Sequence, residues 1–285
     1  MAERAERIGP TAHYTAYVWR RAGFAHARHF STRRGAVYYW GFWALGEWMM
    51  RLRGTTPSMA EVLEHRHRLI DAVVEREQPG VVVELGAGLT RRAVMWAADR
   101  GVPAIEIDLP MMVGLKRRHL ASAPAALRAR LAARHVIHAG DLLAPGFDQR
   151  LAQWLGGHTR PVVVVEGVLG YFDDEARRAA IAAVASGLRW AGGGTMVSSL
   201  HLAADQARAS WSTRVRRAAT KALTRRSSAM EPFADWATLH DGFTSAGFGT
   251  CVRVEPATHA DLEPRLMRLR SFGTVVVARI EPPPS

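Results

Sequence analysis

The run Val-Val-Val-Glu-Leu-Gly-Ala-Gly-Leu at residues 81–89 constrains the fold more than any other part of the sequence. Its apolar residues break at Gly86 and Gly88, and an apolar pattern with two arginines resumes over residues 90–96. This order predicts a strand, a tight turn and a helix. A backbone without Cβ turns sharply and lets a ligand come close, and the next helix begins with free N–H groups aimed at that ligand. The segment therefore predicts a nucleotide-type binding site.

The residues that follow the turn narrow the kind of nucleotide. The dinucleotide fingerprint G-x-G-x-x-G requires a third glycine where this chain has Arg91. The acidic residue that grips ribose hydroxyls is present, because Asp108 ends the short apolar segment 104–108. A glycine turn without the third glycine, followed by a ribose-binding acid, favours S-adenosylmethionine over NAD. For the glycines alone, a turn that merely joins a strand to a helix is an equal alternative.

Arginine supplies almost all of the positive charge. The 285 residues carry a formal net charge of +12, and Lys116 and Lys221 are the only lysines. Such a charge is typical of proteins that bind nucleic acid or an anionic surface. An arginine-rich, lysine-poor composition is also typical of a GC-rich genome. We favour the second interpretation, so nucleic acid is not an expected partner.

The cysteine content and the hydropathy of the sequence indicate the cellular compartment of the protein. Cys251 is the only cysteine, which excludes an intramolecular disulfide and a cysteine-based metal site, and no metal is expected. Residues 1–7 are charged and precede no apolar signal-peptide core. The most apolar window, residues 36–50, is too short to cross a bilayer and contains Glu47. The sequence therefore predicts a cytoplasmic protein without a membrane partner, and it leaves the oligomeric state open.

The chain divides into a helical first third and an alternating remainder. Residues 1–78 contain no convincing strand, and we expect helices from residue 14, over 33–53 and over 58–77. Ser58, with Glu61 three residues later, predicts a capped start for the last of these. From residue 79 onward, strand-like runs alternate with helical patterns. The expected strands are 81–85, 104–108, 134–139, 162–166, 195–200, 250–254 and 271–280.

This alternation predicts an α/β fold with a doubly wound, mostly parallel seven-stranded sheet whose last strand runs antiparallel. We expect an N-terminal helical cap or lid over residues 1–78 and a core over residues 79–285. A basic helical segment at about 203–230 interrupts the core after the fifth strand. We interpret it as a solvated helix face, with a lid over a substrate pocket or a contact with an acidic partner as alternatives.

Glycine or acidic residues stand at the ends of the first four expected strands. Gly86 and Gly88 follow the first strand, and Asp108, Asp141 and Glu166 end the second, third and fourth. Ligands of open α/β sheets bind at the carboxyl ends of the strands. These residues are therefore expected to converge on one crevice.

Four motifs together resemble the leucine carboxyl methyltransferase-like family of S-adenosylmethionine-dependent O-methyltransferases, which includes bacterial members linked to secondary metabolism. The motifs are Glu-Leu-Gly-Ala-Gly-Leu-Thr at residues 84–90, Glu-Ile-Asp-Leu-Pro at 106–110, Gly-Asp-Leu-Leu at 140–143 and Glu-Gly-Val-Leu-Gly-Tyr-Phe at 166–172. The resemblance is strongest over residues 58–200. It implies a Rossmann-like methyltransferase fold, S-adenosylmethionine as cofactor and a small-molecule substrate, and it leaves the methyl acceptor open.

The resemblance also implies roles for individual residues. Arg66, together with Arg68, would pair with the methionine carboxylate of the cofactor, since a guanidinium fork suits that anion. Asp108 would hold the ribose hydroxyls, and Asp141 would accept from the adenine amino group. Glu166 would lie beneath the methionine end. The full set of implied cofactor-binding residues is Arg66, Arg68, Glu84, Gly86, Gly88, Asp108, Leu109, Asp141, Leu142 and Glu166.

The sequence departs from the family pattern at two places. Thr90 and Arg91 stand where family members often have Asp-Thr or Asp-Ser-Arg, and Gly170 replaces a bulky residue of the fourth motif. A glycine there would leave room for a larger substrate or for a lid side chain. The departures affect the identity of the substrate more than cofactor binding.

The catalytic candidates depend on the acceptor. A carboxylate acceptor needs only a cation to orient it, whereas a hydroxyl acceptor needs a base, for which histidine is the usual residue. His201 just past the fifth strand, His13 near the N-terminus and Tyr171 are the candidates. For the histidines a structural hydrogen bond is the alternative, and for Tyr171 a place in the core.

Two other functions stay open at this point. One is a methyltransferase that acts on a macromolecule through the basic surface, although residues 166–169 lack the Asn/Asp-Pro-Pro-Tyr tetrad of base methylation. The other is a cofactor-binding member of the family with a repurposed role and no methyl transfer.

Overall fold

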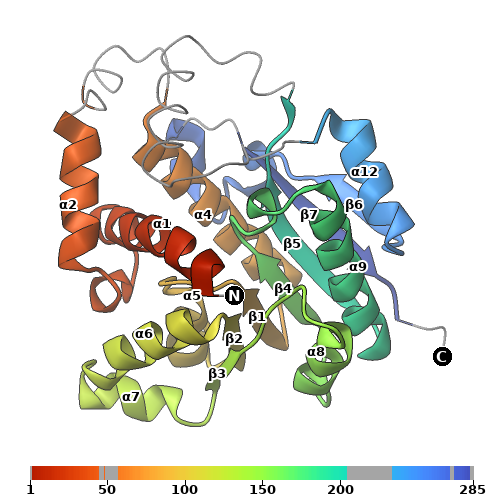
Figure 1. Ribbon diagram of the computed structural model, residues 1–285, viewed down its shortest axis with the longest axis horizontal. Helices are drawn as coiled ribbons and strands as arrows, with labels where there is room; N and C mark the ends of the chain where they lie inside the picture. The colour runs from red at the N-terminus through yellow and green to blue at the C-terminus, as the bar shows by residue number, and fades with distance from the viewer. Residues whose placement is uncertain (1, 45–47, 49–56, 204–232, 270–272, 283–285) are drawn as a thin grey trace.

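The computed structural model describes residues 2–44, 48, 57–203, 233–269 and 273–282. Its centre is a seven-stranded sheet with the strand order β3-β2-β1-β4-β5-β7-β6 (Figure 1). The strands are β1 (Val81–Leu85), β2 (Ala104–Asp108), β3 (His135–Ala139), β4 (Pro161–Val165), β5 (Gly194–Leu200), β6 (Thr250–Arg253) and β7 (Thr274–Ile280). β1 to β5 are parallel, and β7 runs antiparallel to both β5 and β6. The predicted sheet, including its antiparallel last strand, is confirmed.

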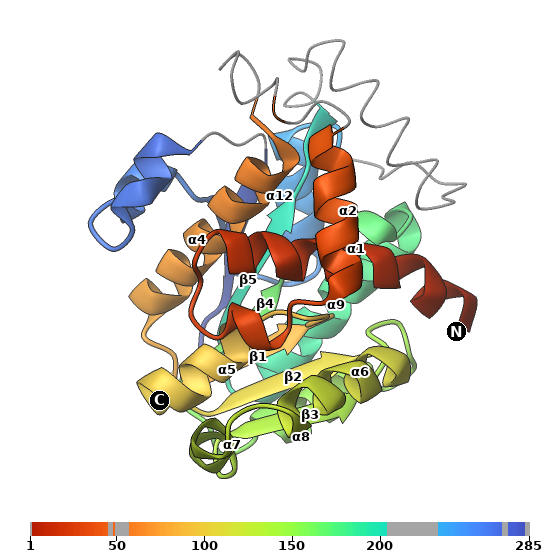
Figure 2. The same ribbon diagram turned by 90° about the vertical axis from the view of Figure 1, so that its left-hand side faces the viewer.

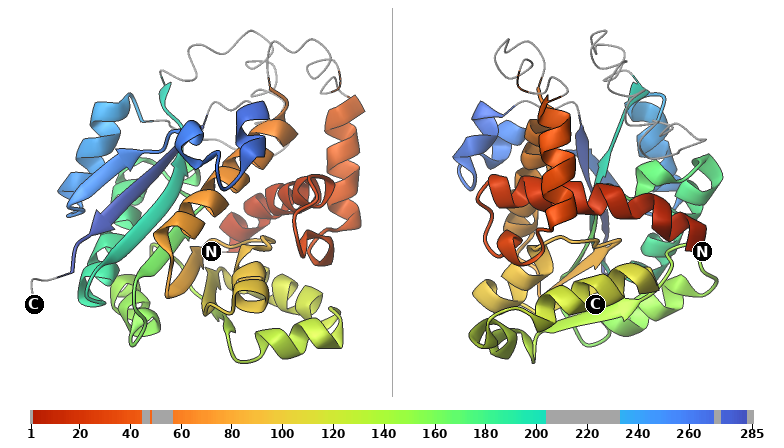
Figure 3. Two further views of the ribbon diagram at one scale, coloured as in Figure 1. Left: turned by 180° about the vertical axis from the view of Figure 1, so that it is seen from behind. Right: turned by 60° about the vertical axis from the view of Figure 1, so that its left-hand side comes forward.

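Helices cover both faces of this sheet (Figure 3). The helices of the described residues are α1 (Ala2–Arg21), α2 (Arg33–Phe42), α4 (Met59–Glu77), α5 (Arg92–Met95), α6 (Pro110–Ala121), α7 (Ala125–Leu131), α8 (Phe147–Leu155), α9 (Asp174–Trp190) and α12 (Trp236–Ser245). Short 3₁₀ or π turns occur at η1 (Ala27–His29), η3 (Trp96–Arg100), η4 (Leu169–Tyr171), η5 (Pro256–His259) and η6 (Pro264–Arg268).

The uninterrupted apolar strands are explained by two separate cores. Val163 of β4 packs in a cluster with Leu151 of α8 and Ile181 of α9. The next residue, Val164, packs in the opposite cluster with Leu69 of α4. Because successive side chains of a strand point to opposite faces, a strand covered on both sides is apolar throughout.

The capped helix starts also follow the sequence. The Ser58 hydroxyl accepts a hydrogen bond from the backbone N–H of Glu61 at 3.1 Å, and α4 begins at the next residue. The Thr32 hydroxyl accepts from the N–H of Gly35 at 3.0 Å and caps α2. The second half of the helix expected over residues 33–53 lies mostly outside the described residues. The same holds for nearly all of the basic helical segment expected at 203–230.

Helices α1 and α2 form a layer beside the carboxyl edge of the sheet (Figure 2). α1 comes so close to the glycine turn that a Cβ added to Gly88 would lie 3.6 Å from Ala12 Cβ. α2 packs on α1 through aromatic rings, with Tyr17 and Tyr39 at 5.3 Å between centroids. We keep the division into a helical cap, residues 1–78, and a core, residues 79–285, as a proposal.

Candidate functional site

The ends of the first four parallel strands meet at one edge of the sheet. The N–H of Gly88, after β1, donates to Asp108 Oδ2 at the end of β2, at 2.5 Å. The N–H of Gly140, after β3, donates to the Asp108 carbonyl at 2.9 Å. A Cβ added to Gly86 would lie 2.4 Å from Cγ2 of Val168, which follows β4. The structure therefore brings the glycine turn, Asp108 and the segments that carry Asp141 and Glu166 together.

Gly86 is required here for two separate reasons. Its φ is +64°, and a side chain at this position would overlap Val168. Gly101 is a matched comparison, because its φ of +69° imposes the same strain but no atom lies within 4 Å of an added Cβ. We expect Gly86→Ala to lower the free energy of unfolding by about 1–3 kcal/mol more than Gly101→Ala does, because only the first variant adds overlap. Urea unfolding of both variants measures this difference. Equal losses of unfolding free energy would contradict the overlap of an added Cβ at Gly86 with Val168.

Asp108 is shaped to accept hydroxyl groups. Its Oδ2 accepts from Gly88 N–H, and its Oδ1 accepts from Leu109 N–H at 2.7 Å. Burial raises the pKa of the Asp108 carboxyl, and the two backbone donors partly offset this effect. Each carboxylate oxygen keeps a lone pair for a further donor. The residue as a whole is half-buried.

Asp141 and Leu142 lie at the end of β3. Asp141 Oδ1 accepts from Leu143 N–H at 3.0 Å, and the residue is half-buried. Leu142 is 9% exposed and packs in the core with Phe147. Leu109, the third expected residue of this region, precedes α6 as its N-cap and is also half-buried.

Glu166 lies in a buried polar cluster that the sequence analysis did not foresee. Its Oε1 accepts from Arg66 Nε at 2.9 Å, and its Oε2 lies 2.8 Å from both Arg92 Nη2 and His67 Nδ1. Arg92 and His67 are both fully buried. The carboxylate is thereby fixed in position at the end of β4.

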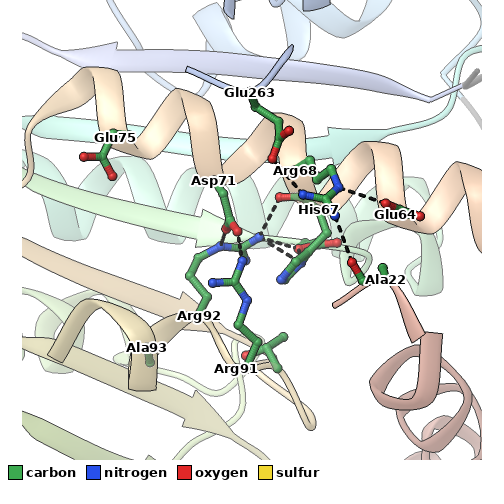
Figure 4. A network of polar contacts seen from close by, with 12 residues as sticks. Ala22, Glu64, His67, Arg68, Asp71, Glu75, Arg91, Arg92, Ala93 and Glu263 are labelled. Carbon is green, nitrogen blue, oxygen red and sulfur yellow. Dashed lines mark hydrogen bonds and ion pairs between the residues drawn. The ribbon is translucent and has the colours of Figure 1, made fainter. Parts of the chain in front are cut away.

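Arg92 connects this carboxylate to two others. Its Nη1 donates to Glu84 at 2.7 Å, and its Nε donates to Asp71 at 2.6 Å. Arg91 forms a second ion pair with Asp71 (Figure 4). Glu84 is 2% exposed, and its other oxygen accepts from the Thr90 hydroxyl at 2.6 Å. Glu84 therefore lies beneath the glycine turn with both oxygens bound by protein groups.

The charge state of this cluster follows from its surroundings. Burial lowers the pKa of His67 well below its ordinary value, so the imidazole is neutral at pH 7. Burial opposes the ionisation of Glu166, but the hydrogen bond with His67 and the charges of Arg92 and Arg66 hold its pKa well below the usual range. The cluster thus keeps an ionised carboxylate next to neutral histidine.

This pKa of His67 predicts a loss of stability in mild acid. Below about pH 6.5 the histidine takes up a proton in the unfolded chain but not in the folded one. The free energy of unfolding therefore decreases as the pH is lowered. One such group contributes up to about 1.4 kcal/mol per pH unit. We expect the decrease between pH 7 and pH 5 to be smaller in His67→Gln than in the wild type. Denaturant unfolding at several pH values measures both slopes, and identical slopes would contradict the neutral buried histidine.

The two arginines expected at the methionine carboxylate differ in their partners. Arg68 pairs with Glu64 at 2.9 Å and Glu263 at 2.7 Å, and it donates to the Ala22 carbonyl at 3.0 Å (Figure 4). Arg66 uses only Nε for Glu166, and no described group hydrogen-bonds to its two terminal nitrogens. Arg66 is therefore the arginine with donors left for an anionic ligand.

A small pocket, with room for about one water molecule, lies beside Arg66. It is lined by Arg66, Gly167 and Gly170, by Arg177 of α9, and by Ser199 and His201 at the end of β5. The structure thus places His201 in the pocket. His13 lies elsewhere, 2.9 Å from the Thr32 hydroxyl, and burial lowers its pKa. Tyr171 is half-buried, packs against the core and is not a lining residue of this pocket.

Arg177 and Ser199 are pocket residues that the sequence analysis missed. Arg177 is 3% exposed, pairs with Asp174 at 2.7 Å and stacks over the Phe233 ring at 4.3 Å. Ser199 accepts from Gly167 N–H at 3.1 Å. The sequence contained one signal for Arg177, because this arginine has the helical spacing of the buried residues Ala180, Ile181 and Val184.

The fold is Rossmann-like, and comparison with known proteins gives the family. A family model described as leucine carboxyl methyltransferase matches residues 25–185, which is more than half of the chain. The chain belongs to this family of S-adenosylmethionine-dependent methyltransferases. Among curated proteins, no sequence matches significantly.

Two solved structures with TM-scores of 0.50 share this fold. An O-methyltransferase family protein from Burkholderia thailandensis is 14% identical, with a TM-score of 0.50 over 90% of this chain and 72% of that one. A putative O-methyltransferase from Nostoc punctiforme PCC 73102 is 12% identical, with a TM-score of 0.50 over 83% and 68%. PigF with SAH is 14% identical, with a TM-score of 0.48, and the match covers 71% of this chain but only 51% of that one. In the part of the chain that the structure describes, no helix combines the length and apolarity needed to cross a membrane.

Proposed function

We propose that this protein is an S-adenosylmethionine-dependent O-methyltransferase that acts on a small molecule. The proposal rests on the Gly88–Asp108 and Arg66–Glu166 hydrogen bonds at the carboxyl edge of the sheet, and on the close approach of the glycine turn to the segment after Glu166. The cytoplasmic location and the link to bacterial secondary metabolism expected from the sequence belong to the same proposal.

The residues present fit this cofactor. Asp108 would hold the ribose hydroxyls, and Gly86 and Gly88, both at positive φ, form the tight turn that leads the chain past it. Arg66 would bind the methionine carboxylate through its terminal nitrogens, while Glu166 would face the amino group. Asp141 and Leu142 would contact the adenine. When bound, S-adenosylmethionine would supply an electrophilic methyl group, and the chain's own residues would align the acceptor.

The pocket favours an acidic acceptor. Arg177 lines it next to Arg66, which is assigned to the cofactor, and none of the lining residues in the described part of the chain is acidic. Planar guanidinium groups bind carboxylates through paired hydrogen bonds. A carboxylate acceptor would then be oriented by Arg177 and would need no base. His201 would act as a base only if the acceptor were a hydroxyl group.

Methyl transfer to a panel of carboxylic acids and phenols tests this proposal. With the best acid, we expect Arg177→Gln to lower kcat/KM by about tenfold to a hundredfold, the effect of a lost hydrogen bond to a charged group. Arg178→Gln is the matched control, since Arg178 pairs with the same Asp174 but is 68% exposed. We expect the control and His201→Gln to keep the wild-type value.

The outcomes separate the candidate reactions. A loss of about a hundredfold or more in His201→Gln, with Arg177→Gln unaffected, would identify a hydroxyl acceptor instead. Bound cofactor without transfer to any acid or phenol would favour the repurposed role. Equal losses of kcat/KM in Arg177→Gln and Arg178→Gln would contradict the proposal that Arg177 orients the acceptor.

A further inference from the structure

Large apolar side chains are exposed on α2 and on the residues that follow it. Val37 is 70% exposed, Trp40 45%, Trp43 40% and Trp48 39%. The rings of Trp40 and Trp43 lie 5.6 Å apart, and those of Trp43 and Trp48 lie 6.5 Å apart. We call these four residues the tryptophan face. A contiguous group of large, exposed apolar side chains is typical of an interaction surface, whereas single exposed apolar residues are common on any protein.

This face is not the side by which α2 packs on the rest of the chain. Tyr39 is 5% exposed and packs with Tyr14 of α1 and Leu63 of α4. Figure 1 shows α2 at the outer edge of the molecule with α1 on its inner side. The helix therefore has two apolar sides, of which one is already used.

The sequence around the tryptophan face is rich in arginine, and the one acid within residues 8–48 is Glu47, which precedes Trp48. Residues 8–46 contain no Asp or Glu, and their five arginines are Arg20, Arg21, Arg28, Arg33 and Arg34. All five are exposed, and no carboxylate of the described residues pairs with any of them. Arg33 and Arg34 share the exposed side of α2 with Val37, and the Arg21 guanidinium lies 5.7 Å from the Trp40 ring.

We propose that the tryptophan face binds an anionic lipid surface. Tryptophan is enriched at membrane interfaces, where its ring lies at the level of the headgroups, and arginines at the rim are attracted to anionic lipid. A helix with apolar residues in one strip and cations beside it lies in the plane of such an interface. This is a surface contact and not a span. It departs from the sequence-based expectation of no membrane partner, and it is independent of the proposed methyl transfer.

The charge distribution favours this partner over the two alternatives. A second copy of the chain would bring the same unpaired arginines against each other. A single-stranded nucleic acid would need aromatic rings interleaved with cations along a groove. Here the rings of Trp40, Trp43 and Trp48 lie next to one another, Arg33 and Arg34 precede them on α2, and one arginine, Arg21, lies over the Trp40 ring.

Cosedimentation of the full chain with vesicles tests the inference. We expect binding to vesicles of equal phosphatidylglycerol and phosphatidylcholine to exceed binding to pure phosphatidylcholine by about tenfold or more. The double variant Trp40→Ser with Trp43→Ser is expected to lose about tenfold or more of this binding. Arg33→Gln with Arg34→Gln should reduce binding to the anionic vesicles only. Trp190→Ser is the matched control, because Trp190 is 55% exposed at the end of α9.

Four results would overturn the inference. The first is equal binding to both kinds of vesicle. The second is wild-type vesicle binding by the double tryptophan variant. The third is a change of oligomeric state in that variant, measured by light scattering. The fourth is stronger binding of the wild type to single-stranded RNA than to anionic vesicles. Unchanged melting temperatures of all variants ensure that a loss of binding is not a loss of fold.

Discussion

Arg92→Met is expected to lower the free energy of unfolding by about 3–5 kcal/mol. Arg92 is fully buried and forms ion pairs with Asp71, Glu84 and Glu166. Methionine keeps much of the volume but removes the charge, so buried carboxylates lose a common partner. Removing one member of a buried ion pair costs far more than the intact pair contributes, because the other charge stays uncompensated. Urea or guanidinium unfolding measures the change.

Arg100→Met serves as the control for this prediction. Arg100 is 51% exposed and pairs with Glu75 at 2.9 Å on the surface. Exposed ion pairs contribute only about 0–1 kcal/mol, since water screens them. The difference in the free energy of unfolding between the two variants therefore measures the effect of burying the ion pairs. Similar losses in both would show that the Arg92 cluster is not the buried support described above.

Asp108→Asn is expected to weaken binding of S-adenosylmethionine by about a hundredfold. The amide keeps the shape of the side chain and one acceptor oxygen, but it loses the charge and one acceptor toward the ribose hydroxyls. A hydrogen bond to a charged group contributes about 1.5–3 kcal/mol, and about 2.7 kcal/mol corresponds to a hundredfold change in Kd. Calorimetric titration of the variant and the wild type measures the ratio.

Asp241→Asn is the matched control for the binding measurement. Asp241 lies on α12 with its side chain 79% exposed, remote in sequence from the strand ends. We expect its Kd to equal that of the wild type. A retained affinity in Asp108→Asn would remove Asp108 from the ribose-binding role. A lowered melting temperature in that variant would mean that the two backbone donors to Asp108 matter for folding as well.

The sheet and the convergence of its first four strand ends could be predicted because both depend on short sequence patterns. A run of apolar β-branched residues such as 162–165 is typical of a strand covered on both faces. A glycine or acid directly after such a run then marks the carboxyl edge. This is why Gly86, Asp108 and Glu166 could be placed near one another from the sequence alone.

The partners of the buried charges could not be predicted in the same way. Glu84 and Glu166 are 82 positions apart in the chain, yet both bind Arg92. Such pairing depends on how α4 and α5 pack against β1, which no short pattern specifies. A weak signal was present, because Glu64 to Arg68 is an unbroken run of ionisable residues on a helix that also carries core positions. Some of these side chains had to be buried and paired.

Isothermal titration of the wild-type chain with S-adenosylmethionine tests the central claim most directly. The claim is that the strand ends around Gly88, Asp108 and Arg66 form a cofactor site. We expect one molecule to bind per chain, with a Kd of the order of micromolar, about −8 kcal/mol. An absence of binding at millimolar cofactor, with a folded chain, would contradict it.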